Sequence, residues 1–172
     1  MGIIAISGKS GCGNTTVLHL VAEKLGFKPI NYTFRSMAKD LSIPFEELLK
    51  RAEKDLEYDR KLDEHQAMLA RQGNTVIGSR LAIWMVPEAD LKVYLRASHE
   101  VRVRWIHARE GGDLASIERF TRERDARDRS RYFTLYNIDI DDLSCAHLVI
   151  DTERWSAAQI AQIIVEAYTV GK

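Results

Sequence analysis

Cysteine is scarce in this chain, which has only Cys12 and Cys145 among its 172 residues. Two isolated cysteines exclude a fold held together by a disulfide framework, and no C-x-x-C pair suggests zinc. The five histidines show no ligand spacing either. We therefore expect no metal site made of protein groups alone.

An excess of charge of one sign is also missing, because 25 basic and 25 acidic residues balance. Nothing favours wholesale binding to nucleic acid or to an anionic membrane, and we expect neither as a partner. No segment approaches the ~18 consecutive apolar residues of a membrane-spanning helix. The opening run Met1 to Ser7 is too short for a signal peptide and lacks a basic start. We expect a cytoplasmic protein.

Strand-like and helical segments alternate without a repeat or a linker, which predicts one α/β domain over residues 1–172 with a parallel sheet. Apolar runs predict buried strands over residues 3–7, 28–31, 75–79, 91–95 and 147–150. One helix should end at Gly26, and Ser42 is the expected N-cap of another. Further helices are expected over residues 57–71, 100–109 and 114–132, and the last should start at a capping box of Ser156 and Gln159.

A glycine-rich segment follows the first predicted strand and opens a helix. In this context the motif predicts a phosphate-binding loop, or P-loop, whose backbone amides cradle phosphate with help from the helix N-terminus. Thr15 stands where the hydroxyl ligand of Mg²⁺ belongs. The expected ATP phosphate-binding residues are Gly8, Lys9, Ser10, Gly11, Cys12, Gly13, Asn14, Thr15 and Thr16.

One position of this loop departs from the pattern G-x-x-x-x-G-K-[ST], because Asn14 replaces the lysine. That lysine normally reaches the β- and γ-phosphates, and asparagine brings no charge. Lys9, the second residue of the loop, is a candidate surrogate. The alternative is that Lys9 is a solvent-facing lysine at the loop edge.

Residues 118–131 hold six arginines, four acids and no lysine. One interpretation is a solvated helix with i,i+4 ion pairs, at 118–122, 123–127, 124–128 and 125–129. The other is a binding face, because arginine suits bidentate phosphate contacts better than lysine does. At ~100° per residue, that face would hold Arg124, Arg127, Asp128 and Arg131.

Taken together, the sequence resembles the cytidylate kinases, in particular the short type of archaea and some bacteria. The resemblance runs over nearly the whole chain and includes the P-loop. Its other main segments are Phe34-Arg35-x-x-Ala38, Asp59-Arg-x-Leu-Asp63, Gly78-Ser-Arg-Leu-Ala82, Glu123–Arg131 and Tyr136–Ser144.

This resemblance implies a P-loop nucleoside monophosphate kinase fold, a five-stranded parallel sheet flanked by helices. Residues 33–73 would form a mobile NMP-binding region, and residues of about 109–125 a mobile lid. The implied reaction transfers the γ-phosphoryl group of Mg²⁺-bound ATP to CMP or dCMP, and we expect a monomer.

The resemblance also implies site residues. Arg35 and Arg80 would lie near the acceptor phosphate, while Arg124, Asp128 and Arg131 would surround the acceptor and the transferring group. Lys9, Arg109 and Arg124 are the expected catalytic residues. Trp105 stands where the short family often has an arginine, so the chain is two cations short of the usual pattern. A kinase for another small acceptor such as AMP, or a nucleotide sensor with a degenerate P-loop, are the alternatives.

Overall fold

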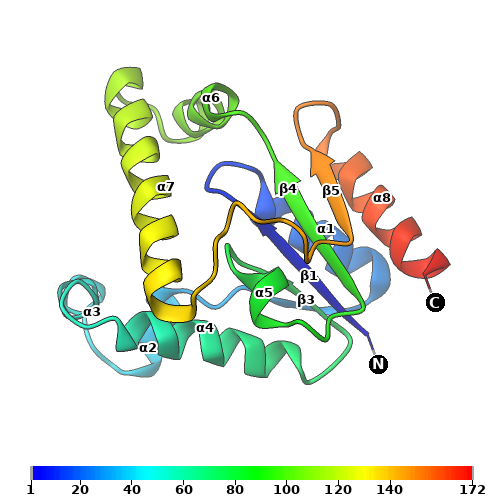
Figure 1. The fold of residues 1–172 in the computed structure, drawn as a ribbon, viewed down its shortest axis with the longest axis horizontal. Helices are drawn as coiled ribbons and strands as arrows, with labels where there is room; N and C mark the ends of the chain where they lie inside the picture. Colours follow the sequence, from blue (N-terminus) through cyan, green and yellow to red (C-terminus); the bar gives the residue numbers. More distant parts are fainter. Residues whose placement is uncertain (1, 172) are drawn as a thin grey trace.

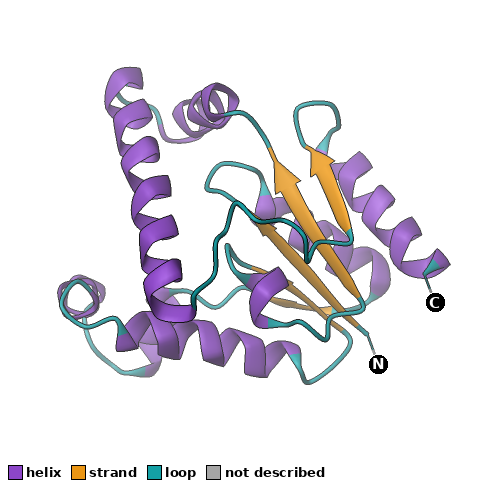
Figure 2. Ribbon diagram, viewed as in Figure 1, coloured by secondary structure: helices purple, strands orange, loops and turns teal. Residues whose placement is uncertain are grey.

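A computed structural model describes residues 2–171. Five parallel strands form one sheet in the order β2-β3-β1-β4-β5 (Figures 1 and 2). The strands are β1 Ile3–Gly8, β2 Lys28–Ile30, β3 Thr75–Gly78, β4 Leu91–Arg96 and β5 Leu148–Asp151. All five expected strands are therefore present, with ends that differ by at most one residue.

Alternate residues of the strands belong to two separate hydrophobic cores, one on each face of the sheet. Ile4 and Ile6 of β1 pack with α1 (Asn14–Leu25) and α8 (Ala157–Val170) on one face of the sheet. Ala5, between them in the chain, packs on the other face with α5 (Ala82–Met85) and the end of α4 (Glu57–Ala70). Helices cover both faces, which is why the strand sequences are apolar runs rather than alternating patterns.

The remaining helices lie beyond the carboxyl ends of the strands. They are α2 Phe34–Asp40, α3 Phe45–Ala52, α6 His99–Glu110 and α7 Leu114–Tyr136. In Figure 1 the long α7 stands apart from the sheet, between α6 at one end and the α2, α3 and α4 group at the other. No helix within residues 2–171 is long and apolar enough to cross a membrane.

The structure corrects one predicted helix start and adds two helices. Ser42 does not cap a helix: it has a φ of 54°, and α3 begins at Phe45 after Pro44. Helix α2, capped by Thr33, and the short α5 had not been expected. The capping box of Ser156 and Gln159 is confirmed.

Candidate active site

The P-loop turns tightly between β1 and α1. Gly11 and Gly13 have φ values of 87° and 84°, a region that residues with a side chain rarely adopt. At Gly8 the constraint is space, since a Cβ there would lie 2.7 Å from the carbonyl oxygen of Leu95. The glycines therefore let the backbone close around a small volume in front of the N-terminus of α1.

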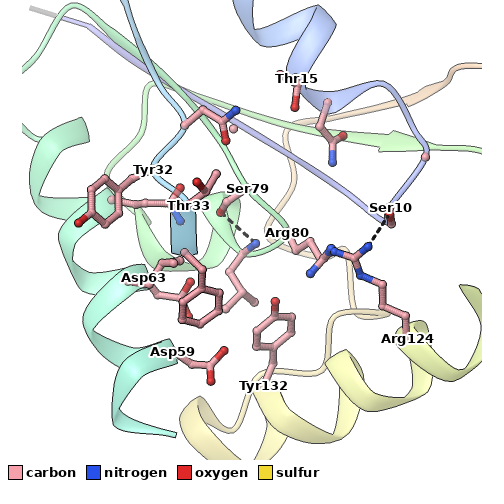
Figure 3. Close-up of a pocket in the computed structure, with 18 of the residues that line it drawn as sticks. Ser10, Thr15, Tyr32, Thr33, Asp59, Asp63, Ser79, Arg80, Arg124 and Tyr132 are labelled. Atoms are coloured by element: carbon pink, nitrogen blue, oxygen red, sulfur yellow. Dashed lines mark hydrogen bonds between the residues drawn. The ribbon is translucent and has the colours of Figure 1, made fainter. Parts of the chain in front are cut away.

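This loop forms one end of a cavity of about 370 Å³. Ser10, Thr15 and Arg124 lie at one side of the close-up in Figure 3, and Tyr32, Asp59 and Asp63 lie at the other. The cavity thus extends from the phosphate loop to helix α4. Its lining comes from the P-loop, the segments that follow β2 and β3, and helices α4, α6 and α7.

Asn14, at the lysine position, is turned back onto the loop. Its Nδ2 donates a hydrogen bond of 2.7 Å to the carbonyl oxygen of Gly8, and its buried Oδ1 has no partner among the described residues. Asn14 lines the cavity together with Thr15 and Thr16. The side chain therefore braces the loop, and it brings no positive charge to the cavity.

Lys9 lies on another side of the loop. Its Nζ is 3.0 Å from Oδ1 of Asp141, and about a third of its side chain is exposed. It lines a separate hollow with Cys12, whose thiol pKa is raised by burial. To reach a phosphate in the P-loop, Lys9 would have to leave Asp141.

Asp128 joins two arginines from different elements. Its buried carboxylate lies 3.1 Å from Nη1 of Arg80, which follows β3, and 3.1 Å from Nη2 of Arg131 on α7. Arg131 also pairs with Asp59 of α4 at 3.0 Å. Both arginines line the cavity, so this network fixes two guanidinium groups in its wall.

Arg124, one turn before Asp128 on α7, has no carboxylate partner among residues 2–171. Its Nη1 donates to Oγ of Ser10 at 3.4 Å. Burial and the nearby Arg80 lower its pKa. The Asp128 carboxylate acts on Arg124 from beyond ion-pair distance and opposes this shift of its pKa. A half-buried cation that points at the P-loop and forms no ion pair with a described residue is a natural place for an anion.

The other predicted arginines are more loosely placed. Arg109 lines the cavity, but its guanidinium is exposed and pairs with Glu110. Arg35 is exposed and stacks on the ring of Phe45 at 4.0 Å, and it is not among the residues that line the cavity. Arg127, which the helical spacing had placed on the binding face, is exposed and lies outside this lining.

Of the two interpretations of residues 118–131, the one based on four i,i+4 ion pairs along α7 is mostly not realised. Only the pair of Glu118 and Arg122 forms, at 2.9 Å. Asp125 instead pairs with Arg102 of α6, and Asp128 pairs with the two arginines described above. Acids predicted to stabilise one helix therefore connect α7 to neighbouring elements.

Sequence reasoning missed the full polar face of α4. Asp59, Asp63 and Gln66 recur at i, i+4 and i+7, all are buried, and all line the cavity. The first two had entered only as parts of a family motif. Polar residues at the spacing of a buried helix face were the available signal.

Comparison with known proteins shows to which family this chain belongs. Residues 3–154 match the cytidylate kinase-like family. The chain belongs to that family. It is 44% identical over 165 residues to cytidylate kinase 2 of Borrelia garinii, covering 94% of this chain and 93% of the relative. It is 41% identical over 167 residues to the cytidylate kinase of Pyrococcus horikoshii, with 96% and 87% covered.

Solved structures of other kinases share the fold. Shikimate kinase from Bacteroides thetaiotaomicron superposes with a TM-score of 0.66 at 17% identity, over 96% of this chain and 97% of that one. Deoxyadenosine kinase from M. mycoides with bound dCTP gives 0.58 at 18% identity, over 97% and 98%. These likenesses confirm the P-loop kinase fold of this cytidylate kinase-like protein.

Arg102, on α6, is another residue that sequence reasoning did not single out for the site. It is buried on α6, where its Nη2 lies 2.5 Å from Oδ2 of Asp125 and its Nη1 donates to the carbonyl oxygen of Ser10 at 3.0 Å. One guanidinium thus joins α6, α7 and the P-loop. We conclude that Arg102 positions the loop relative to the helices that face it.

Thr15 is the residue that fits a magnesium ion. It stands in the first turn of α1, exposed to the cavity. The described residues contain no group of three or more His, Cys, Asp or Glu side chains that would hold a metal by themselves. Magnesium at phosphate sites takes few protein ligands and relies on substrate oxygens and water, so a single hydroxyl suits it.

Proposed function

We propose that this protein is a cytidylate kinase, which transfers the γ-phosphoryl group of Mg²⁺-bound ATP to CMP or dCMP and gives ADP and CDP or dCDP. It would act as a monomer in the cytoplasm, without nucleic-acid or membrane partners. The observation that carries this proposal is one cavity joining a P-loop to a wall of arginines, in a chain that matches the cytidylate kinase-like family over residues 3–154.

The proposed roles follow from the two ends of the cavity. The backbone amides of the P-loop would hold the ATP phosphates, as the N-terminus of α1 favours negative charge. Arg80 and Arg131, held in place by Asp128, would bind the acceptor phosphate. Arg124, which donates to Ser10 of the P-loop, would stabilise the charge that spreads over the transferring group, because phosphoryl transfer needs positioning and neutralisation rather than covalent help.

Thr15 would hold Mg²⁺ together with phosphate oxygens. Bound there, the ion would neutralise charge on the β- and γ-phosphates. Residues 33–73 and about 109–125 would close over the two nucleotides and exclude water. Arg35, Lys9 and Arg109 would need to move from their present partners to join the phosphates.

A second candidate is a nucleotide sensor with little or no catalysis. Asn14 favours it, because its amide is engaged with Gly8 and supplies no cation. Against it stands the buried arrangement of Asp128 with two arginines, for which a module that binds ATP alone would have less use. A kinase for AMP is the third candidate, and the same arginines would serve it.

A coupled assay of ADP formation with ATP and CMP, dCMP, UMP, AMP or GMP separates the three. We expect CMP and dCMP to give the highest initial rates at equal concentration. A faster rate with AMP would overturn the assignment of the acceptor. ATP binding without turnover of any monophosphate would favour the sensor.

A further inference from the structure

One end of the cavity is lined by polar side chains of α4 that the phosphate chemistry does not use. Asp59, Asp63 and Gln66 share one helix face and are 5%, 9% and 3% exposed. Figure 3 shows Asp59 and Asp63 on the far side of the cavity from Thr15. Burying a polar group costs free energy unless the group finds a hydrogen-bond partner. The partners of these three side chains, or the lack of one, therefore indicate their roles.

Asp59 forms an ion pair with Arg131 at 3.0 Å, so its partner lies within the chain. The side-chain oxygen of Gln66 has no such partner. This Oε1 is buried and accepts no hydrogen bond from any residue in the range 2–171. A buried acceptor without a hydrogen bond destabilises the free protein. A ligand that donates an N–H into the cavity would remove this penalty.

Asp63, three residues before Gln66, has a hydrogen-bond partner at one of its two carboxylate oxygens. Its Oδ2 accepts the hydroxyl hydrogen of Tyr136 at 2.8 Å, which leaves Oδ1 for another donor. Burial raises the pKa of Asp63 to about 6, although the Tyr136 hydrogen bond opposes the shift. At neutral pH the carboxylate is therefore mostly ionised and only accepts hydrogen bonds.

Two neighbouring acceptors match a group that carries two N–H donors. The exocyclic amine of cytosine is such a group, whereas uracil has a carbonyl oxygen at the same position. Phe34 and Leu62 also line the cavity and offer apolar surface to a ring. Uracil O4 would meet two acceptors and leave them unpaired, a mismatch that sites of this kind reject strongly.

We propose that Gln66 and Asp63 read the exocyclic amino group of the acceptor base and so separate CMP from UMP. The amine donates one hydrogen to Oε1 of Gln66 and the other to Oδ1 of Asp63. Tyr136 orients the carboxylate from α7, and Asp59 with Arg131 fixes the neighbouring turn of α4. This inference rests on the proposed function and adds the residues that set its specificity.

The test compares kcat/KM for CMP and for UMP in three variants. Asp63→Asn introduces an N–H that can pair with uracil O4 and keeps an oxygen for Tyr136. We expect the CMP-to-UMP ratio to fall about tenfold or more, the scale on which a matched pair of hydrogen bonds discriminates between bases. Gln66→Met removes the free acceptor, so KM for CMP should rise about tenfold while KM for ATP stays unchanged. Glu64→Gln, exposed on α4, is the matched control and should change neither value.

The outcomes separate this inference from the function on which it rests. CMP turnover with an unchanged CMP-to-UMP ratio in both Asp63→Asn and Gln66→Met overturns the base-reading role alone. Absence of turnover in the unaltered protein overturns the kinase assignment. In that case calorimetric binding of CMP and UMP makes the same comparison, and equal affinities overturn the inference. If circular dichroism shows that Asp63→Asn does not fold, Gln66→Met decides.

Discussion

Asn14 closes the phosphate loop across its two ends, as its Nδ2 donates a 2.7 Å hydrogen bond to the carbonyl oxygen of Gly8. At the position where the usual motif has a lysine, this chain thus has a side chain that holds the loop together by a hydrogen bond. Neutralisation of the departing phosphoryl group must come from another cation. Lys9, within the loop, and Arg124, which donates to Ser10, are two candidates, and they differ in how they are held.

Lys9→Ala tests the first candidate. If Lys9 replaces the missing lysine, kcat should fall by ~10² or more, the usual scale for losing one electrostatic catalytic group. Asp141→Asn is the companion variant, because it removes the carboxylate that pairs with Lys9 at 3.0 Å and leaves the positive charge of Lys9 in place. Asp141→Asn should keep or raise the rate. Steady-state kinetics decide, and a near-native kcat in Lys9→Ala would end the surrogate role and leave Arg124 as the cation.

Variants at Asn14 should cost less than loss of a cation. Asn14→Ala removes the brace to Gly8, so we expect about 1 kcal/mol less stability and a smaller fall in kcat than in Lys9→Ala. Asn14→Lys restores the charge of the usual motif, and it should be tolerated or raise the rate. Denaturant titration and initial rates measure the two effects. A larger kcat loss in Asn14→Ala than in Lys9→Ala would contradict this ranking and make the amide of Asn14 more important to catalysis than the charge of Lys9.

The strands were predictable because both faces of a parallel sheet are buried. Ile3-Ile-Ala-Ile-Ser7 reads as one apolar run, although Ile4 and Ala5 belong to different cores. The prediction that Ser42 caps a helix was wrong. Serine is a common N-cap residue, but here Ser42 has a φ of 54° and lies in a turn before Pro44. Local sequence does not distinguish these two uses of a serine.

The site was predictable where a motif fixes backbone geometry, as in the P-loop. It was not predictable where partners come from other elements. Asp125 finds Arg102, 23 residues away, rather than the arginine four residues along its own helix. The free Oε1 of Gln66 becomes visible only once α4 is placed against the cavity.

Arg102→Ala should be strongly destabilising. The side chain is 3% exposed, and its removal leaves the partly buried carboxylate of Asp125 and the carbonyl oxygen of Ser10 without their donor. We expect a loss near 3 kcal/mol, the low end of the ~3–5 kcal/mol for breaking a buried pair. Arg122→Ala, which removes an exposed pair with Glu118, is the control and should change stability by less than about 1 kcal/mol. Similar losses in the two variants would contradict the positioning role of Arg102.

Asp128→Ala should weaken binding of the acceptor more than binding of ATP. Its carboxylate holds Arg80 and Arg131, which line the cavity away from the P-loop backbone. We expect the Kd for CMP to rise about tenfold, because Arg80 loses its carboxylate partner and Arg131 loses one of two, and ordering such side chains again on binding costs roughly 0.5–1.5 kcal/mol each. The Kd for ATP should change little. Separate titrations of the two nucleotides check this, and equal losses would count against the assignment.

The raised pKa of Asp63 predicts how stability depends on pH. Burial shifts the pKa from 3.8 to about 6, so the folded protein holds this proton more tightly than the unfolded chain does. Between pH 4 and 6 the folded state therefore binds more protons. The contribution of Asp63 to the free energy of unfolding must fall as pH rises through this window. A shift of about two units corresponds to ~3 kcal/mol over the full range.

Asp63→Asn isolates this contribution, because asparagine does not titrate and still accepts the hydroxyl hydrogen of Tyr136. Relative to the unaltered protein, the variant should gain stability as pH rises from 4.5 to 7, and other acids cancel in the difference. In the unaltered protein the CMP-to-UMP ratio should also fall below pH 6, when a protonated Asp63 becomes a donor. Burial is the largest cause of the raised pKa of Asp63, and Tyr136, Asp59, Arg131 and Arg80, which face the same carboxyl group, modify the shift. A stability difference that is flat with pH, measured by urea titration, would mean that Asp63 is ionised throughout, and the loss of base discrimination at low pH would then be absent as well.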